Sequence, residues 1–188
     1  MIPVFEDNRG RKIALLAHCL LNQNSISDGT ADFPAQFREV VDFLMANNIG
    51  LIQLPCPELT CLGLDRGDPH GGSRELLEEN SRIRRLLEAP EQKDKLKSLV
   101  RPIVYQVEEY GKHGFEIVGL VGINRSPSCG IETTSKGDRE VPGNGVFMDV
   151  LLRELAAAGI DIPAVGVKTG RVAESLTTLK AFLKTRPE

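Results

Sequence analysis

Residues 116–130 read EIVGLVGINRSPSCG, and this stretch decides the fold. The part from Glu116 to Ile123 is largely apolar and short, which is typical of a strand that is covered on both faces. A polar segment, Asn124 to Gly130, follows at once and carries Cys129. A strand of this kind, followed by a loop and then by a helix, is the repeating unit of parallel α/β sheets.

Two other apolar runs precede a cysteine in the same way. Ile13 to Ala17 leads to Cys19, and Leu51 to Leu54 leads to Cys56. In a doubly wound parallel sheet, the carboxyl ends of neighbouring strands form the ligand crevice. We therefore expect three thiols that are far apart in the sequence to meet at one edge of the sheet.

Segments with the apolar spacing of helices alternate with these runs. The expected helices cover Pro34 to Asn48, Ser73 to Leu87, Gln92 to Tyr110, Gly145 to Ala158 and Val172 to Lys184, and a fourth strand covers Ala164 to Val167. Pro102 should kink the third helix or mark its effective start. A long loop is expected from Leu59 to Gly72, and an irregular polar segment from Ile131 to Gly143.

The resulting order, β-α-β-α-α-β-α-β-α, predicts an α/β fold of the Rossmann-like, three-layer type. The simplest arrangement is a four-stranded parallel sheet in the order 2-1-3-4. In that order the second and third strands flank the first, so all three cysteine-bearing ends are adjacent. The direction of winding changes between the first and third strands, where ligands of this fold class bind.

The composition bounds the class of protein. The chain has 188 residues, of which 41% are hydrophobic, so we expect a single domain over residues 1–188. A net charge of -3, with acidic and basic residues interspersed, predicts no broad nucleic-acid surface and no attraction to an anionic membrane. No apolar run approaches the ~20 residues of a membrane-spanning helix. The expected partner is a small molecule.

The segment from Arg9 to Leu21 combines basic residues, a short apolar run and a cysteine, as a lipoprotein signal does. His18 interrupts that run, however, and no small residue directly precedes Cys19. We therefore expect a cytoplasmic protein whose four cysteines are reduced thiols or metal ligands.

Three converging thiolates suggest a metal ion or a cluster. A structural zinc site normally has four ligands, and a three-ligand zinc with an open position is less often built from cysteine alone. A cubane iron-sulfur cluster normally takes four cysteines, so three would leave one iron without a protein ligand. Soft sulfur ligation favours a sulfur-containing partner at such a position.

Three segments resemble the signature motifs of the 2-thiouracil desulfurase family. They are Cys19-Leu20-Leu21, Cys56-Pro57-Glu58 and Ser126-Pro127-Ser128-Cys129-Gly130, and each follows an expected strand. The resemblance runs in order over most of the chain, up to the helix that begins near Gly145. The chain departs from the family after the first motif, at residues 22–29, and only approximates its Gly-Leu-x-x-Pro-Arg pattern at residues 63–66.

The resemblance implies an enzyme, a 4Fe-4S-dependent desulfurase (desulfidase). Cys19, Cys56 and Cys129 would hold a 4Fe-4S cluster with one iron lacking a protein ligand. That iron would take the sulfur of a small thiolated substrate, such as a thiopyrimidine-like heterocycle, by non-redox Lewis-acid chemistry. The sulfur would leave as sulfide or pass to a sulfur acceptor.

Five further residues complete the expected site. Glu58 stands two residues after a proposed ligand and is the candidate general acid or base. Ser128 is a second catalytic candidate. Asn22, Asn124 and Ser126 stand in loops that should line the pocket, and we expect them to contact the substrate.

Two alternatives stay open at this point. A non-catalytic iron-sulfur or zinc-binding module would need the three cysteines but not Glu58. A cysteine-persulfide sulfurtransferase would rely on one reactive thiol, for which Cys61 in the glycine-rich loop is the candidate. A dinucleotide-binding enzyme is disfavoured, because residues 19–25 contain no glycine.

Overall fold

A computed structural model describes residues 6–184 of the chain. Its central sheet has four parallel strands in the order β2-β1-β3-β6. The strands are β1 (Lys12–Leu16), β2 (Ile49–Gln53), β3 (Glu116–Ile123) and β6 (Ala164–Val167). The predicted fold class and strand order are therefore confirmed.

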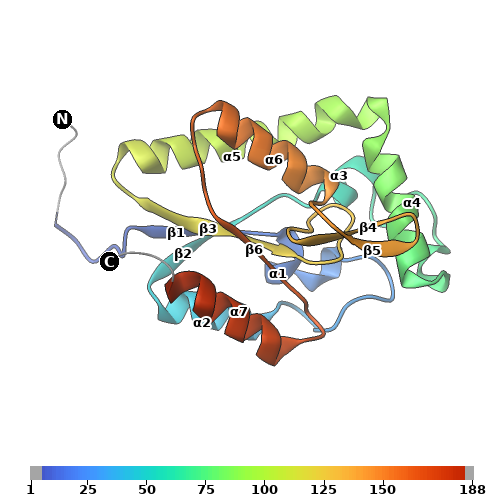
Figure 1. Ribbon diagram of the computed structural model, residues 1–188, viewed down its shortest axis with the longest axis horizontal. Coiled ribbons are helices and arrows are strands. Elements are labelled where there is room, and N and C mark those ends of the chain that lie inside the picture. The colour runs from blue at the N-terminus through green and yellow to red at the C-terminus, as the bar shows by residue number, and fades with distance from the viewer. Residues whose placement is uncertain (1–5, 185–188) are drawn as a thin grey trace.

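Helices cover both faces of this sheet, which gives three layers (Figure 1). The helices α5 (Lys93–Lys112) and α6 (Val146–Ala157) lie on one face, and α2 (Arg38–Ala46) and α7 (Val172–Lys184) lie on the other. The central strands are accordingly the most buried, since every residue from Val118 to Ile123 and from Ile13 to Leu16 is buried. β2 lies at one edge of the sheet, and its burial is only partial.

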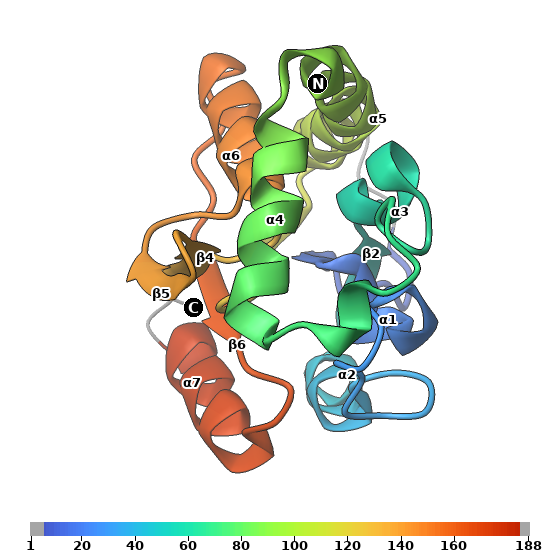
Figure 2. The same cartoon turned by 90° about the vertical axis from the view of Figure 1, so that its right-hand side faces the viewer.

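Short elements gather at the carboxyl edge of the sheet. After β1 come α1 (His18–Leu21) and a 3-10 turn, η1 (Gln23–Ser25), and after β2 comes α3 (Pro57–Leu62). Helix α4 (Leu76–Glu88) lies across this edge (Figure 2). Two short turns, η2 (Gly71–Ser73) and η3 (Pro90–Gln92), stand at its two ends.

The structure differs from the prediction at two loops. Helix α3 occupies the start of the expected loop from Leu59 to Gly72, because Cys56 caps the helix and Pro57 fits its first turn. The segment from Ile131 to Gly143 is not irregular. It contains an antiparallel hairpin of β4 (Thr133–Lys136) and β5 (Arg139–Pro142).

The signal for this hairpin is the dipeptide Gly137-Asp138. Both residues have positive φ, +60° and +57°, which is the conformation of a tight type I′ hairpin turn. The strands on either side are polar, so the segment lacks the alternation of apolar residues that usually marks strands.

Helix boundaries also differ. Helix α5 runs through Pro102, so this residue does not mark its start; a continuous buried stripe that includes Val100 and Ile103 supports the helix on both sides of the proline. Helix α2 begins at Arg38 rather than at Pro34, and α4 begins at Leu76 rather than at Ser73. Within residues 6–184, no helix is long and apolar enough to cross a membrane.

Candidate functional site

The three cysteines that follow β1, β2 and β3 line a single cavity of about 80 Å³. This volume is several times what one ordered water molecule needs. The cavity lies where the strands end: the amide of Ala17 donates to the Val121 carbonyl (2.9 Å), and the amide of Leu54 donates to the Leu16 carbonyl (2.8 Å). These bonds continue the sheet to the positions from which Cys19, Cys56 and Cys129 emerge.

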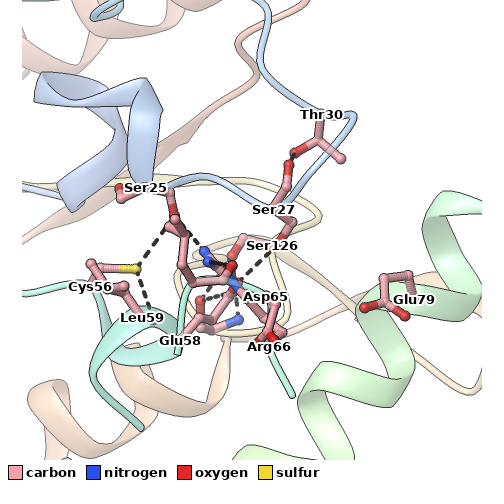
Figure 3. A network of polar contacts seen from close by, with 12 residues as sticks. Ser25, Ser27, Thr30, Cys56, Glu58, Leu59, Asp65, Arg66, Glu79 and Ser126 are labelled. Atoms are coloured by element: carbon pink, nitrogen blue, oxygen red, sulfur yellow. Dashed lines mark hydrogen bonds and ion pairs between the residues drawn. The ribbon is translucent and has the colours of Figure 1, made fainter. Parts of the chain in front are cut away.

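A local hydrogen bond fixes the position of each cysteine. Cys19 stands in α1, where its carbonyl accepts a bond from the Gln23 side chain (2.8 Å). Cys56 caps α3, and its Sγ accepts from the Leu59 amide at 3.4 Å (Figure 3). Cys129 is buried, and its amide donates to Ser126 Oγ at 2.9 Å.

The cavity disfavours uncompensated thiolates. Burial raises the pKa of all three thiols, and charge repulsion from neighbouring groups raises it further. For Cys19 the neighbours are Cys56 and Glu58, and for Cys129 the foremost neighbour is Cys19. A cation between the thiols would reverse this preference, because it stabilises the deprotonated form.

Glu58 lies in the wall of the same cavity and is 7% exposed. Its Oε1 accepts a hydrogen bond from Ser128 Oγ at 2.6 Å. Its Oε2 accepts from Ser27 Oγ and from Arg66 Nε, both at 3.2 Å. The carboxylate is therefore fixed by three donors from three different loops.

Arg66 is the ion-pair partner of Glu58, and its side chain is 3% exposed. The guanidinium also donates to the Leu64 carbonyl at 2.6 Å and to the Ser25 carbonyl. Figure 3 shows how Arg66 joins Glu58 to the loop that carries Ser25 and Ser27. The sequence did not single out Arg66 as a site residue; the one signal was the partial Gly-Leu-x-x-Pro-Arg pattern at residues 63–66.

The two predicted serines have distinct surroundings in this cavity. Ser128 Oγ lies between Glu58 Oε1 and Cys129 Sγ, 3.5 Å from the sulfur. Ser126 Oγ accepts from the amides of Ser128 (3.3 Å) and Cys129 (2.9 Å). Ser126 thus shapes the loop around Cys129, whereas Ser128 contacts both the acid and the thiol.

The two predicted asparagines are placed differently. Asn124 lines the cavity, but its Oδ1 already accepts from the amides of Ile131, Glu132 and Thr133 at 3.1 to 3.4 Å. Asn22 is not among the residues that line the cavity, and its Oδ1 accepts from the amide and side chain of Asn24. Substrate contact by either residue stays a prediction.

Cys61 lies apart from this group. It belongs to helix α3, not to a loop, and it is buried in the hydrophobic core. It does not line the cavity of the other three cysteines. Burial raises its pKa, so it lacks the low pKa of a reactive thiol.

A second, outer cavity of about 250 Å³ adjoins the first. The two share Ser27, Thr30, Leu76, Asn80 and Arg125. Asn80 comes from α4, which the sequence placed in no site.

The donor set in this cavity includes three thiols. Among residues 6–184, no group of three or more His, Cys, Asp or Glu side chains is arranged to hold a metal ion. A cubane cluster differs from a single ion because its cysteines bind different iron atoms. Three thiols that line one cavity would each bind a different iron atom of such a cluster.

The fold and the cavity define a Rossmann-like α/β protein with three cysteines and a buried Glu–Arg pair at the carboxyl edge of its sheet. The chain is 32% identical, over 157 residues, to the uncharacterized protein MJ0003 of Methanocaldococcus jannaschii. The match covers 84% of this chain and 86% of the archaeal protein, so the chain belongs to the same family. No protein-family model matches the chain, and no solved structure matches it.

Proposed function

We propose that this protein removes sulfur, as sulfide, from a small thiolated compound. The observation that carries the proposal is the single cavity that Cys19, Cys56 and Cys129 line together with Glu58 and Ser128. Three thiols supply the ligands of a 4Fe-4S cluster with one iron free of protein ligands, and such an iron is a Lewis acid for sulfur when the cluster is bound. The net reaction exchanges C=S and water for C=O and hydrogen sulfide, without oxidation or reduction.

The chain's own residues handle the proton in this reaction. Ser128 Oγ donates to Glu58 Oε1 at 2.6 Å and stands at the cavity wall. A water that attacks the thiocarbonyl carbon can therefore pass its proton through the Ser128 hydroxyl to Oε1. Arg66 supplies the positive charge that a buried carboxylate needs and holds it in one orientation.

The positions of the residues favour this function over its two rivals. A purely structural cluster would not require a buried carboxylate, Glu58, that accepts a hydrogen bond from Ser128 in the same cavity. A persulfide enzyme centred on Cys61 would require an accessible thiol with a low pKa, whereas Cys61 is buried in the core. Three thiols also fall short of the four ligands that a structural zinc ion normally takes.

The decisive experiment measures iron and acid-labile sulfide in protein that has been purified without oxygen. Three single variants, in which serine replaces Cys19, Cys56 or Cys129, should each lose most of the bound iron. The matched control is Cys61→Ser, which should keep the cluster because Cys61 lies outside the cavity. Loss of iron in Cys61→Ser to the same extent would refute the assignment of ligands.

Catalysis is tested separately with the cluster intact. Glu58→Gln keeps the shape of the side chain but cannot accept the proton, so sulfide release from 2-thiouracil should slow ~10²- to 10⁴-fold. Iron content should stay at the wild-type level. A wild-type protein that binds the cluster but desulfurates no thiolated compound would favour the non-catalytic module.

A further inference from the structure

Helix α4 places one polar side chain in the wall of both cavities. This residue is Asn80, and it is 7% exposed. Figure 2 shows how α4 crosses the edge at which the strands end. The amide makes one hydrogen bond, from Nδ2 to Ser135 Oγ at 3.2 Å. Among residues 6–184, no group donates to its Oδ1.

The orientation of the Asn80 amide follows from its neighbours. The Ser135 hydroxyl donates to the Arg125 carbonyl at 2.6 Å, and a carbonyl oxygen can only accept. The single hydroxyl hydrogen of Ser135 is spent on that bond. The Ser135 oxygen must therefore accept from Asn80, so Nδ2 faces Ser135 and Oδ1 is the atom left for another partner.

The Asn80 oxygen is not sealed from solvent, and its residue lines both cavities. Among residues 6–184, a side-chain atom that is sealed from solvent and has no hydrogen-bond partner is found at Gln92 Oε1 and not at Asn80. Asn80 Oδ1 lacks a partner but is not sealed. A nearly buried carbonyl oxygen that the protein leaves unpaired is an acceptor for a donor group that a ligand brings.

We propose that Asn80 Oδ1 accepts a hydrogen bond from the N–H group beside the thiocarbonyl of the substrate, and so selects thioamide-type compounds with a free N–H. This inference rests on the proposed function. Asn80 and the three cysteines line the same inner cavity, so a ligand whose sulfur lies near the thiols also lies near Asn80. A thioamide N–H is attached to the carbon that bears the sulfur, which makes it the donor closest to the reacting group.

Two probes test this preference: 2-thiouracil and its 1,3-dimethyl derivative, which has no N–H. We would measure their binding to the iron-free protein by equilibrium dialysis and their sulfide release by the iron-loaded protein. Wild type should prefer 2-thiouracil. Asn80→Leu removes the acceptor at similar size, so that preference should fall about tenfold. Asn80→Asp keeps an acceptor oxygen and should keep the preference.

The outcomes separate this inference from the function on which it rests. If Asn80→Leu retains the full wild-type preference, Asn80 does not read the N–H, and the desulfuration proposal still stands. If wild type neither binds nor desulfurates 2-thiouracil, this inference fails, whereas the proposed function fails only when no thiolated compound is desulfurated. If Asn80→Leu does not fold, Ser135→Ala replaces it: without the Ser135 oxygen the amide can turn over, so the preference should fall, and an unchanged preference overturns the inference.

Discussion

The Glu58–Arg66 pair is a buried ion pair beside the cysteine cavity, and the two side chains are 9% and 3% exposed. Removing charges from water is costly, so such a pair is weak evidence for stability as a whole. Each partner nevertheless depends on the other, because either charge alone would be buried without a counter-charge. The pair therefore fixes the carboxylate more than it stabilises the fold.

Arg66→Met should reveal this dependence. It leaves the Glu58 carboxylate buried and unpaired, and we expect a loss of about 3–5 kcal/mol in the free energy of unfolding. The double variant Glu58→Gln/Arg66→Met removes both charges and should lose clearly less than the sum of the two single variants. Urea denaturation measures all three. Additive losses would show that the pair is not coupled.

Asn124 is a second residue whose role is open to a direct test. Its Oδ1 accepts from three backbone amides of the segment that follows Cys129. Asn124→Leu leaves these amides without that acceptor and should cost about 1–3 kcal/mol of stability. Asn124→Asp retains an acceptor oxygen and should cost less, as judged by urea denaturation. Equal losses in the two variants would mean that the hydrogen bonds are not what matters.

At the scale of elements, ion pairs hold the first turns of α4 near the site. Glu79 accepts from Arg82 at 2.5 and 2.8 Å and from Arg74 at 3.0 Å, and Arg74 also pairs with Asp68 at 2.5 Å. The bonds of Arg74 join α4 to the segment that precedes it. Because Asn80 follows Glu79 directly, the same network sets the position of Asn80 at the cavity wall.

Glu79 should make stability depend on pH in the acid range. The hydrogen bonds from Arg82 are the main cause that lowers the pKa of Glu79 below its ordinary value of 4.5. The folded state therefore prefers the ionised form, so this contribution is present above about pH 4.5 and is lost as the pH falls through the lower, folded-state pKa. The stability difference between wild type and Glu79→Gln should be largest near pH 7 and shrink in acid.

Urea denaturation at several pH values between 7 and ~3 tests this expectation. The matched control is Glu78→Gln, which changes an exposed residue of the same helix. Its stability difference from wild type should vary less with pH. A difference for Glu79→Gln that stays constant over the whole range would show that its ionisation is not linked to folding.

The parallel strands could be predicted, because each is a short apolar run and the connections between them are helical. The bounds of β3 and β6 match the prediction, and those of β1 and β2 differ by one or two residues. The sequence did not predict the hairpin of β4 and β5, because its strands are polar. Their side chains, such as Thr134 and Ser135, make hydrogen bonds to the loop that carries Cys129. Tertiary contacts, not an apolar pattern, bury these residues.

At the scale of the whole molecule, the site joins loops that lie far apart in the chain. The strand order predicts that the three cysteines come together, and that order follows from the apolar runs and the helical connections between them. The parts contributed by Arg66 and Asn80 could not be predicted in this way. Arg66 has a left-handed backbone (φ +52°), and Asn80 reaches the site only because α4 crosses the sheet edge.

Under the proposed function, removal of iron should weaken the whole fold. A cofactor that binds only the native state stabilises that state by mass action. The cysteines that would bind the cluster come from three separate segments of the chain. Chelation of iron from the loaded protein should therefore lower its Tm, and reconstitution should restore it. Cys129→Ser, which should hold little iron, provides the control and should show no such change. An equal effect of the chelator on this variant would mean that it does not act through the cluster.

The positions of the three cysteines also bear on the order of events during synthesis. The first two stand at positions 19 and 56, and the third stands at position 129 of 188, after the strand that pairs with β1. On the ribosome, the emerging chain therefore carries two of these three thiols for a long interval before the third is synthesised. The proposed cluster needs all three, so it can be inserted only after residue 129 has left the ribosome, when most of the chain has been translated.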